Sequence, residues 1–333
     1  MLATTVINYC EKIGQDFDLV QGAGGNVSWK ENGALWVKAS GTRLSEAKFQ
    51  NIFVPIELRA LTAEIEHGHF NATPKVLNDS QLKPSIETCL HALMPHKIVV
   101  HVHAIPIVAT LVKKNASDIL ANSLNSKLDY ALVEYAKPGE HLAKAVYETL
   151  KKNPNVNIVF LKNHGVVIGG SSVEEIDLLL RLACDSLSQT LFEYSPNKLP
   201  QNIVAPLNSI IPNKKQIQHL AFDASLFQKV KDYWAIYPDH IVFLGPRAIT
   251  FESLTQFEST KYDIIPELFF IKNVGVFCKE PLNKDKEEQL YCYFKVVSKL
   301  EEIDKCDVLS NNEISALTDW DAEKYRLKIS KGI

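Results

Sequence analysis

Two histidines separated by one residue, His101 and His103, could share a metal ion. Residues 98–102 are mostly β-branched, which predicts a strand. Alternate residues of a strand lie on one face, about 6.6 Å apart, so both imidazoles can reach the same ion. Two histidines on the polar face of a half-buried strand would give the same pattern. The apolar flanks predict burial, however, and buried imidazoles need a polar partner.

The element before this strand is predicted to be a short helix. Ile86 and Leu90 are at helical spacing, and Pro95 ends the pattern. Ser85 can cap the helix, and Glu87 is an acid in its first turn. A carboxylate is therefore expected near the histidine pair.

A third histidine, His164, lies in Asn163-His164-Gly165, a predicted tight turn within the apolar residues 156–170. A histidine in a turn is usually a surface residue, but here it is a candidate third ligand. His67 and His69 form another pair, with a glycine between them and acids around them. That composition predicts a solvated loop rather than a metal site.

The glycine-rich residues 22–25 could bind an anion through backbone N–H groups, or could be only a tight turn. They do not fit a dinucleotide-binding fingerprint, because Val27 replaces the third glycine and residues 26–39 are predicted to form a hairpin. Tyr291 and Lys295 have dehydrogenase spacing but no glycine-rich βαβ start before them. A dehydrogenase site is therefore disfavoured.

The composition is that of a globular protein. The chain has 333 residues, a net charge of -3 and 46% hydrophobic residues, enough for one large or two medium domains. Near-neutral charge gives no support for a nucleic-acid or membrane partner, and no apolar run predicts a transmembrane helix. The N-terminus lacks a signal-peptide pattern, and the 6 cysteines form no Cys-x-x-Cys motif. We expect reduced thiols and a cytoplasmic location.

Four prolines in the polar residues 195–214 predict a linker. We expect a metal-binding domain over residues 1–198 and a smaller α/β domain over residues 215–333. The smaller domain contains similarities to the first: residues 237–246 resemble 94–103, and residues 270–276 resemble 160–166. The alternative is chance similarity of two strand pairs. Our hypothesis is a degenerate partial repeat whose three ligand positions carry other residues, namely Leu244, Pro246 and Val274.

Five ordered motifs together resemble the class II aldolase/adducin family, over roughly residues 5–195. They are Gly25-Asn26-Val27-Ser28, Ser40-Gly41, Pro84-Ser85-Ile86-Glu87, His101-Val102-His103 and Asn163-His164-Gly165. The stretch from Pro84 is most similar to the aldolase part of rhamnulose-1-phosphate aldolase-like proteins. The resemblance implies a three-layer α/β/α domain on a mostly antiparallel sheet. It also implies a homo-oligomer, with a tetramer favoured, and sites at subunit interfaces.

The resemblance further implies a metal-dependent aldolase, an aldehyde-lyase that cleaves or forms a C–C bond in a small sugar or sugar phosphate through a metal-stabilised enediolate. His101, His103 and His164 would hold a divalent metal, most often Zn²⁺, and Glu87 would be the catalytic acid/base. The substrate's anionic end would bind six small or polar residues: Gly25, Asn26, Ser28, Ser40, Gly41 and Ser85.

The chain departs from the family pattern in two places. Relatives acting on sugar phosphates usually have Ser-Ser-Glu, but Ile86 stands in the middle here, so one phosphate-binding hydroxyl is missing. The family's interface tyrosine has no clear counterpart, and Tyr130 and Tyr135 are the nearest candidates. Two other readings stay open. A metal-dependent epimerase, dehydratase or decarboxylase of a sugar-acid derivative would use the same intermediate, and a non-catalytic adducin-like scaffold would need no metal.

Overall fold

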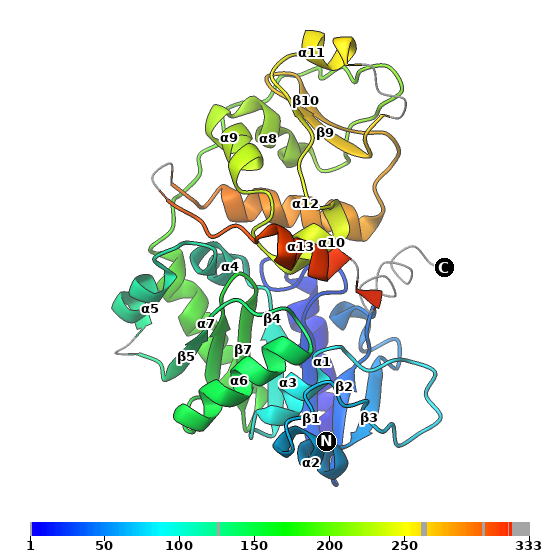
Figure 1. Ribbon diagram of the computed structural model, residues 1–333, viewed down its shortest axis with the longest axis vertical. Helices are drawn as coiled ribbons and strands as arrows, with labels where there is room; N and C mark the ends of the chain where they lie inside the picture. Colours follow the sequence, from blue (N-terminus) through cyan, green and yellow to red (C-terminus); the bar gives the residue numbers. More distant parts are fainter. Residues whose placement is uncertain (1, 125–126, 261–264, 302–303, 319, 322–333) are drawn as a thin grey trace. The chain divides into compact units, whose positions relative to one another are not determined.

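The structure, a computed structural model, describes residues 2–124, 127–260, 265–301, 304–318 and 320–321 (Figure 1). The chain divides into two compact units between Thr190 and Leu191. Each unit is an α/β structure with its own sheet.

The first unit is built on a seven-stranded mixed sheet with the strand order β3-β2-β1-β4-β7-β6-β5. All neighbours are antiparallel except β5 and β6, which are parallel. The strand that carries His101, and that ends just before His103, is therefore the central one. The strands are β1 (Asn26–Glu31), β2 (Ala34–Lys38), β3 (Phe53–Glu57), β4 (Ile98–Val102), β5 (Tyr130–Val133), β6 (Ile158–Leu161) and β7 (Gly165–Gly170).

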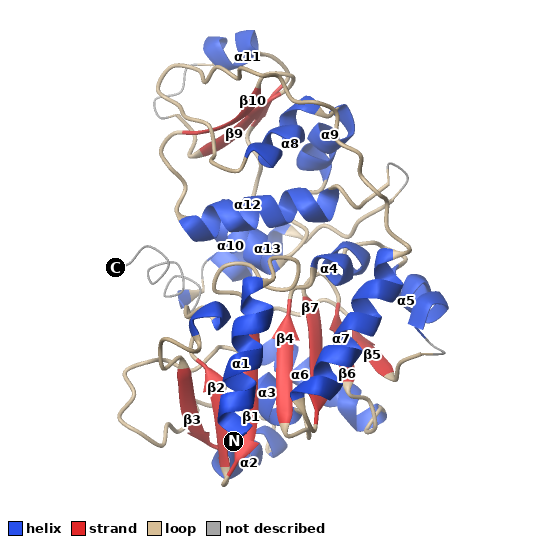
Figure 2. Ribbon diagram, turned by 180° about the vertical axis from the view of Figure 1, so that it is seen from behind, coloured by secondary structure: helices blue, strands red, loops and turns tan. Residues whose placement is uncertain are grey.

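Helices cover both faces of this sheet, which gives the expected three-layer α/β/α domain (Figure 2). Alternation along β4 shows why two layers form, since Val100 packs into one core and Val99 into the other. One face carries α1 (Leu2–Gln15), α4 (Ile105–Leu111), α5 (Ala116–Leu124) and α7 (Val173–Ser188). The opposite face carries α2 (Leu58–Glu66), α3 (Thr88–Leu93) and α6 (Glu140–Lys152). A short 3-10 turn, η1 (Leu44–Glu46), packs beside α1.

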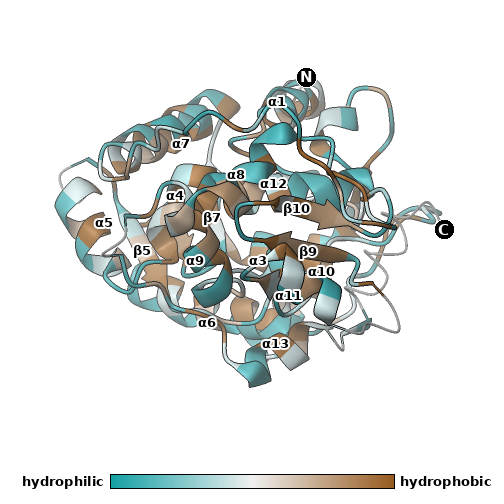
Figure 3. Cartoon of the chain, turned by 90° about the horizontal axis from the view of Figure 1, so that it is seen from above, coloured by the Kyte–Doolittle hydropathy of each residue, from teal (hydrophilic) through white to brown (hydrophobic). Residues whose placement is uncertain are grey.

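The second unit has a three-stranded sheet with the order β10-β9-β8. β8 and β9 are parallel, and β9 and β10 are antiparallel. Figure 3 shows β7 and β10, one strand from each unit, as mainly hydrophobic. The elements are η2 (Lys215–Gln218), α8 (His219–Phe222), α9 (Ala224–Asp232), α10 (Pro238–Leu244), β8 (Thr250–Phe251), α11 (Leu254–Ser259), β9 (Leu268–Ile271), β10 (Gly275–Cys278), α12 (Lys284–Val297) and α13 (Asn311–Thr318).

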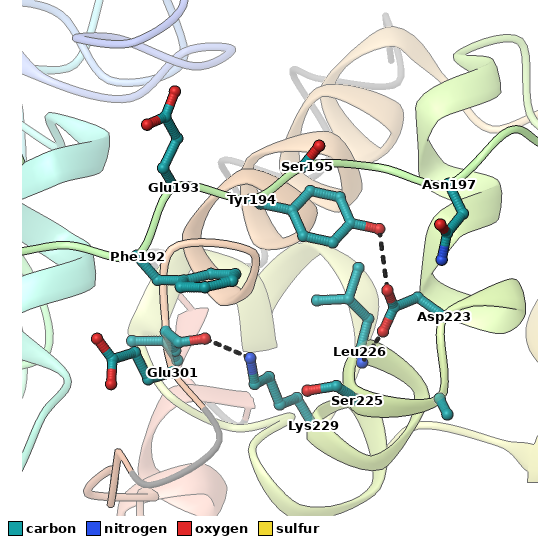
Figure 4. A pocket seen from close by; sticks show the side chains of 12 residues that line it. Phe192, Glu193, Tyr194, Ser195, Asn197, Asp223, Ser225, Leu226, Lys229 and Glu301 are labelled. Carbon is teal, nitrogen blue, oxygen red and sulfur yellow. Dashed lines mark hydrogen bonds between the residues drawn. The ribbon is translucent and has the colours of Figure 1, made fainter.

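The segment just after the division at Thr190 packs within the second unit, where it borders a cavity of about 550 Å³ (Figure 4). The Tyr194 hydroxyl donates to Asp223 Oδ2 at 3.3 Å, and Asp223 Oδ1 accepts from the Leu226 N–H to cap α9. The buried Lys229 ammonium donates to the carbonyls of Val297 and Leu300 at the end of α12. These hydrogen bonds connect the three segments that line the cavity, namely the segment around Tyr194, helix α9 and the residues at and after the end of α12.

The strand expected within residues 237–246 is wrong, because residues 238–244 form helix α10. Pro238 occupies the first turn, where its missing N–H costs nothing, and Gly245 ends the helix at φ +88°. Ile241, Val242 and Phe243 are all buried, and a short apolar run of this kind does not distinguish a strand from a buried helix. Leu244 and Pro246 therefore do not correspond to the histidines of β4.

Candidate metal centre

The three histidines converge because of strand pairing. His101 is on β4, His103 follows its end, and His164 lies in the turn between β6 and β7. β4 and β7 are antiparallel, with His101 opposite Val167, so the turn falls beside the end of β4. The three ring centroids are 4.8–5.0 Å apart, and one nitrogen from each ring lies within 4.8 Å of the others.

Hydrogen bonding orients the His101 ring toward this point. Its Nδ1 lies 3.0 Å from the Val166 carbonyl oxygen, which can only accept, so Nδ1 carries the proton. Its Nε2 then faces His103 Nε2 at 3.0 Å. Two imidazole lone pairs this close need a proton or a cation between them. A backbone carbonyl behind a metal-ligating histidine is the usual supporting contact, so these residues fit a divalent metal.

The turn with His164 can lie this close to β4 because residue 165 is glycine. A Cβ atom on Gly165 would be 2.5 Å from the Val102 carbonyl oxygen and 3.0 Å from His103 Cδ2. Asn163 has a left-handed backbone with φ +53°, a conformation that asparagine tolerates better than most residues. Asn-His-Gly therefore suits both the turn and its contact with β4.

Glu87 brings a carboxylate to the three imidazoles. Its Oε2 is 3.5 Å from His101 Nε2, and its Oε1 is 3.6 Å from His164 Nε2. The Asn26 side chain donates to Oε2 at 2.7 Å, and the β1–β4 register places Asn26 opposite His101. Glu87 is 6% exposed, so a buried acid lies beside the histidines.

Glu87 stands in the turn before α3, which begins at Thr88 rather than near Ser85. The buried Ser85 hydroxyl accepts from the Glu87 N–H at 3.2 Å, which fixes this turn. A bridge between Ala39 and Pro84 brings Ser40 and Gly41 alongside. The structure thus brings Ser40 and Gly41 beside Ser85, which lies two residues before Glu87 in the same turn.

The remaining expected site residues lie at the start of β1. Gly25 has φ +67°, and a Cβ there would be 3.0 Å from the His101 carbonyl oxygen. The glycine loop therefore packs directly against β4. Ser28 is fully buried on the same face of β1 as Asn26, and its hydroxyl is hydrogen-bonded to His91 Nδ1 at 2.8 Å.

Two buried polar residues were not anticipated from the sequence. His91 is fully buried one helical turn after Glu87, and burial holds its pKa well below the ordinary value. The spacing Glu87-x-x-x-His91 puts both on one helix face and was the available signal. Lys38, 2% exposed, donates to the Ala23 carbonyl at 3.1 Å. It places a positive charge behind the glycine loop.

Other candidates lie apart from this centre. Tyr130 is on the edge strand β5, and β6 and β7 separate it from β4. Its ring packs on Phe160, which belongs to the core on the other face from Val99. His67 and His69 are exposed after α2, where His69 Nδ1 contacts Glu64 Oε2 at 2.7 Å. They follow α2, which packs on β2 and β3, whereas the three-histidine group lies at the end of β4.

Residues 4–180 match the family model described as the Class II Aldolase and Adducin N-terminal domain. Since this match covers more than half of the 333 residues, the chain belongs to the class II aldolase/adducin family. Family members include metal-dependent aldolases, in keeping with the buried three-histidine group. No helix within the described ranges is long and apolar enough to span a membrane.

Individual relatives match about half of the chain. The chain is 29% identical over 178 residues to the uncharacterized oxidoreductase YuxG of Bacillus subtilis, which covers 49% of this chain but only 25% of that protein. The N-terminal class II aldolase domain of a conserved Thermoplasma acidophilum protein is 27% identical, with a TM-score of 0.48, over 56% of this chain and 92% of that one. A sugar-phosphate aldolase from Thermotoga maritima is 17% identical, with a TM-score of 0.43, over 55% and 94%.

Proposed function

We propose that the chain is a metal-dependent aldolase that cleaves or forms a C–C bond in a small sugar or sugar phosphate. The observation that carries the proposal is the position of Glu87, whose two oxygens lie 3.5 Å and 3.6 Å from His101 Nε2 and His164 Nε2. A proton-transfer group thus stands beside the place where three imidazoles meet.

The metal in this proposal is Zn²⁺, which accepts three imidazoles and keeps an open position. When bound, it supplies a Lewis acid that stabilises negative charge on substrate oxygens. Glu87 takes the proton from the hydroxyl beyond the scissile bond and later returns one to carbon. Asn26 fixes the carboxylate by its 2.7 Å hydrogen bond to Oε2, so that the same group can serve both steps.

We place the anionic end of the substrate at the glycine loop and the neighbouring turn, with Gly25, Ser40, Gly41 and Ser85 as the binding residues. Lys38 supports this placement, because a buried ammonium behind the loop favours a negative charge in front of it. Ser28 supports the site indirectly, since its buried hydroxyl is hydrogen-bonded to His91.

Elemental analysis of the purified protein tests the metal part of the proposal. We expect about one zinc per chain in the wild type, none in His164→Ala, and one in the control His67→Ala, whose side chain is exposed. A wild type that takes up no metal when zinc is supplied would overturn the aldolase proposal and favour an adducin-like scaffold.

Product analysis tests the reaction class. Ketoses and ketose phosphates incubated with the zinc-loaded enzyme should release an aldehyde, and Glu87→Gln should keep its zinc but lose at least about 100-fold in kcat. Release of carbon dioxide, loss of water or an epimer instead of an aldehyde would assign the site to a decarboxylase, dehydratase or epimerase. The family resemblance also favours a homo-tetramer, which light scattering of the purified protein would test.

A further inference from the structure

The hairpin of the second unit repeats the pairing of the hairpin that carries His164. Leu161 pairs with Gly165 between β6 and β7, and Ile271 pairs with Gly275 between β9 and β10. Each residue of the second pair follows its counterpart by 110 positions (161 to 271 and 165 to 275). The two hairpins therefore have the same register and turn length.

The turns inside these hairpins also agree. Asn163 and Asn273 are both left-handed, at φ +53° and +57°. The N–H of Asn163 donates to the carbonyl of Leu111, the last residue of α4, and the N–H of Asn273 donates to the Ala221 carbonyl in α8. Leu111 and Ala221 are again 110 positions apart, so Val274 stands where His164 stands.

The elements around the hairpins follow one order in both units. A parallel strand precedes each hairpin, with Val133 opposite Leu161 and Phe251 opposite Ile271. The N–H of the next residue donates to that strand in both units, Lys162 to Val133 and Lys272 to Phe251, at 2.9 Å each. Each hairpin is followed by a long helix, α7 or α12, with a side-chain cap.

The place of β4 is also filled in the second unit. Val100 of β4 pairs with Ile168 of β7, and Ile210 forms an antiparallel bridge to Cys278 of β10. The offset is 110 at both positions (100 to 210 and 168 to 278). By this register, His101 corresponds to Ile211 and His103 corresponds to Asn213.

We infer that residues 208–297 are a second copy of residues 98–188. In this copy the metal corner, meaning the place of the three histidine ligands, is filled by Ile211, Asn213 and Val274. Ile211 and Val274 pack against one apolar cluster, which includes Phe269 and Phe277. The copy starts after the part of the chain that supplies Asn26 and Glu87, so these two residues have no counterpart within it.

A glutamine side chain hydrogen-bonds to the backbone of β10 beside the metal corner of the second unit. Gln218 Nε2 donates to the Val276 carbonyl at 2.9 Å, and the Val276 N–H donates to Gln218 Oε1 at 2.8 Å. In the first unit the corresponding residue, Val166, faces Val102 of β4. A carboxamide thus makes in the second unit the pair of hydrogen bonds that a strand residue can make.

Restoring the three histidines tests the inference. The variant Ile211→His/Asn213→His/Val274→His should bind one more Co²⁺ per chain than its parent, with a visible absorption spectrum of low-coordinate cobalt. The comparison is a difference, so it holds whether the parent binds one ion or none and does not depend on the proposed aldolase activity. All three positions are half-buried or exposed, so imidazoles can replace them.

The matched control moves one histidine off the predicted corner. Ile211→His/Asn213→His/Lys272→His has the same three imidazoles, and we expect at least tenfold weaker cobalt binding. Should the triple variant not fold, the double variant Ile211→His/Val274→His should still gain thermal stability from added Co²⁺. No extra cobalt in either variant, or equal binding by the control, would overturn the inference.

Discussion

Substitution of Gly165 by alanine should disrupt the candidate metal centre through steric contact alone. The added Cβ would lie 2.5 Å from the Val102 carbonyl oxygen, where ordinary contact begins at 3.4 Å, so turn and strand must separate by about 0.9 Å. The obstacle is backbone and cannot rotate away. Overpacking of this kind costs about 1–3 kcal/mol of stability. Because Zn–N bonds are about 2.0–2.1 Å long, the same displacement detaches His164, and we expect at least a 100-fold loss of zinc affinity.

Zinc affinity is measured by competition with a chromogenic chelator, and stability by thermal unfolding. The matched control is Gly33→Ala in the β1–β2 turn, where no atom lies within 4 Å of the added Cβ and φ is +77°. That change carries only backbone strain of about 1–2 kcal/mol and should leave zinc affinity unchanged. Zinc affinity of Gly165→Ala within twofold of wild type would refute the reasoning.

Three further predictions concern other groups. Asn26→Ala removes a hydrogen bond to a buried carboxylate, worth about 1.5–3 kcal/mol, and should lower kcat about 10- to 100-fold at unchanged zinc content; an unchanged kcat would contradict it. Burial lowers the pKa of His240 to about 3, so the unfolded state binds the extra proton and stability falls as pH drops from about 6.5 to 3, by up to about 1.4 kcal/mol per pH unit. Urea unfolding followed by tryptophan fluorescence, to which Trp234 beside His240 contributes, should show a shallower pH dependence in His240→Leu, and equal slopes would count against the assignment. Chelation should lower the Tm of zinc-loaded wild type but not that of His164→Ala, whereas equal shifts would place the ion elsewhere.

Local sequence patterns predicted the central part of the first unit. The β-branched residues before His101 form β4, and Asn163 and Gly165 provide the turn expected from their backbone preferences. Strand β4 and this turn could be predicted because each is determined by residues adjacent in the sequence. The side-chain contacts depend on pairing between distant segments, so the bond from Asn26 to Glu87 and the burial of Ser28 against His91 could not be read from spacing.

The second unit shows the same limit. The sequence similarity around Asn273 reflects a real turn, because the left-handed backbone of this turn depends only on the residues within it. The similarity around Ile241 does not, because a buried helix and a buried strand share an apolar composition. The true counterpart of β4, near Ile210, has little sequence likeness to it and is recognised by its bridge to Cys278.

The two copies of this segment should differ in how they move. β4 has hydrogen-bonded neighbours on both sides, β1 and β7, so its amides can exchange with solvent only when the middle of the sheet opens. Ile210 is joined to β10 by an isolated bridge, so its surroundings can open locally at small cost. A metal ion that binds the three histidines of the first unit therefore meets imidazoles that are already held in place. Little of its binding free energy is spent on ordering the chain.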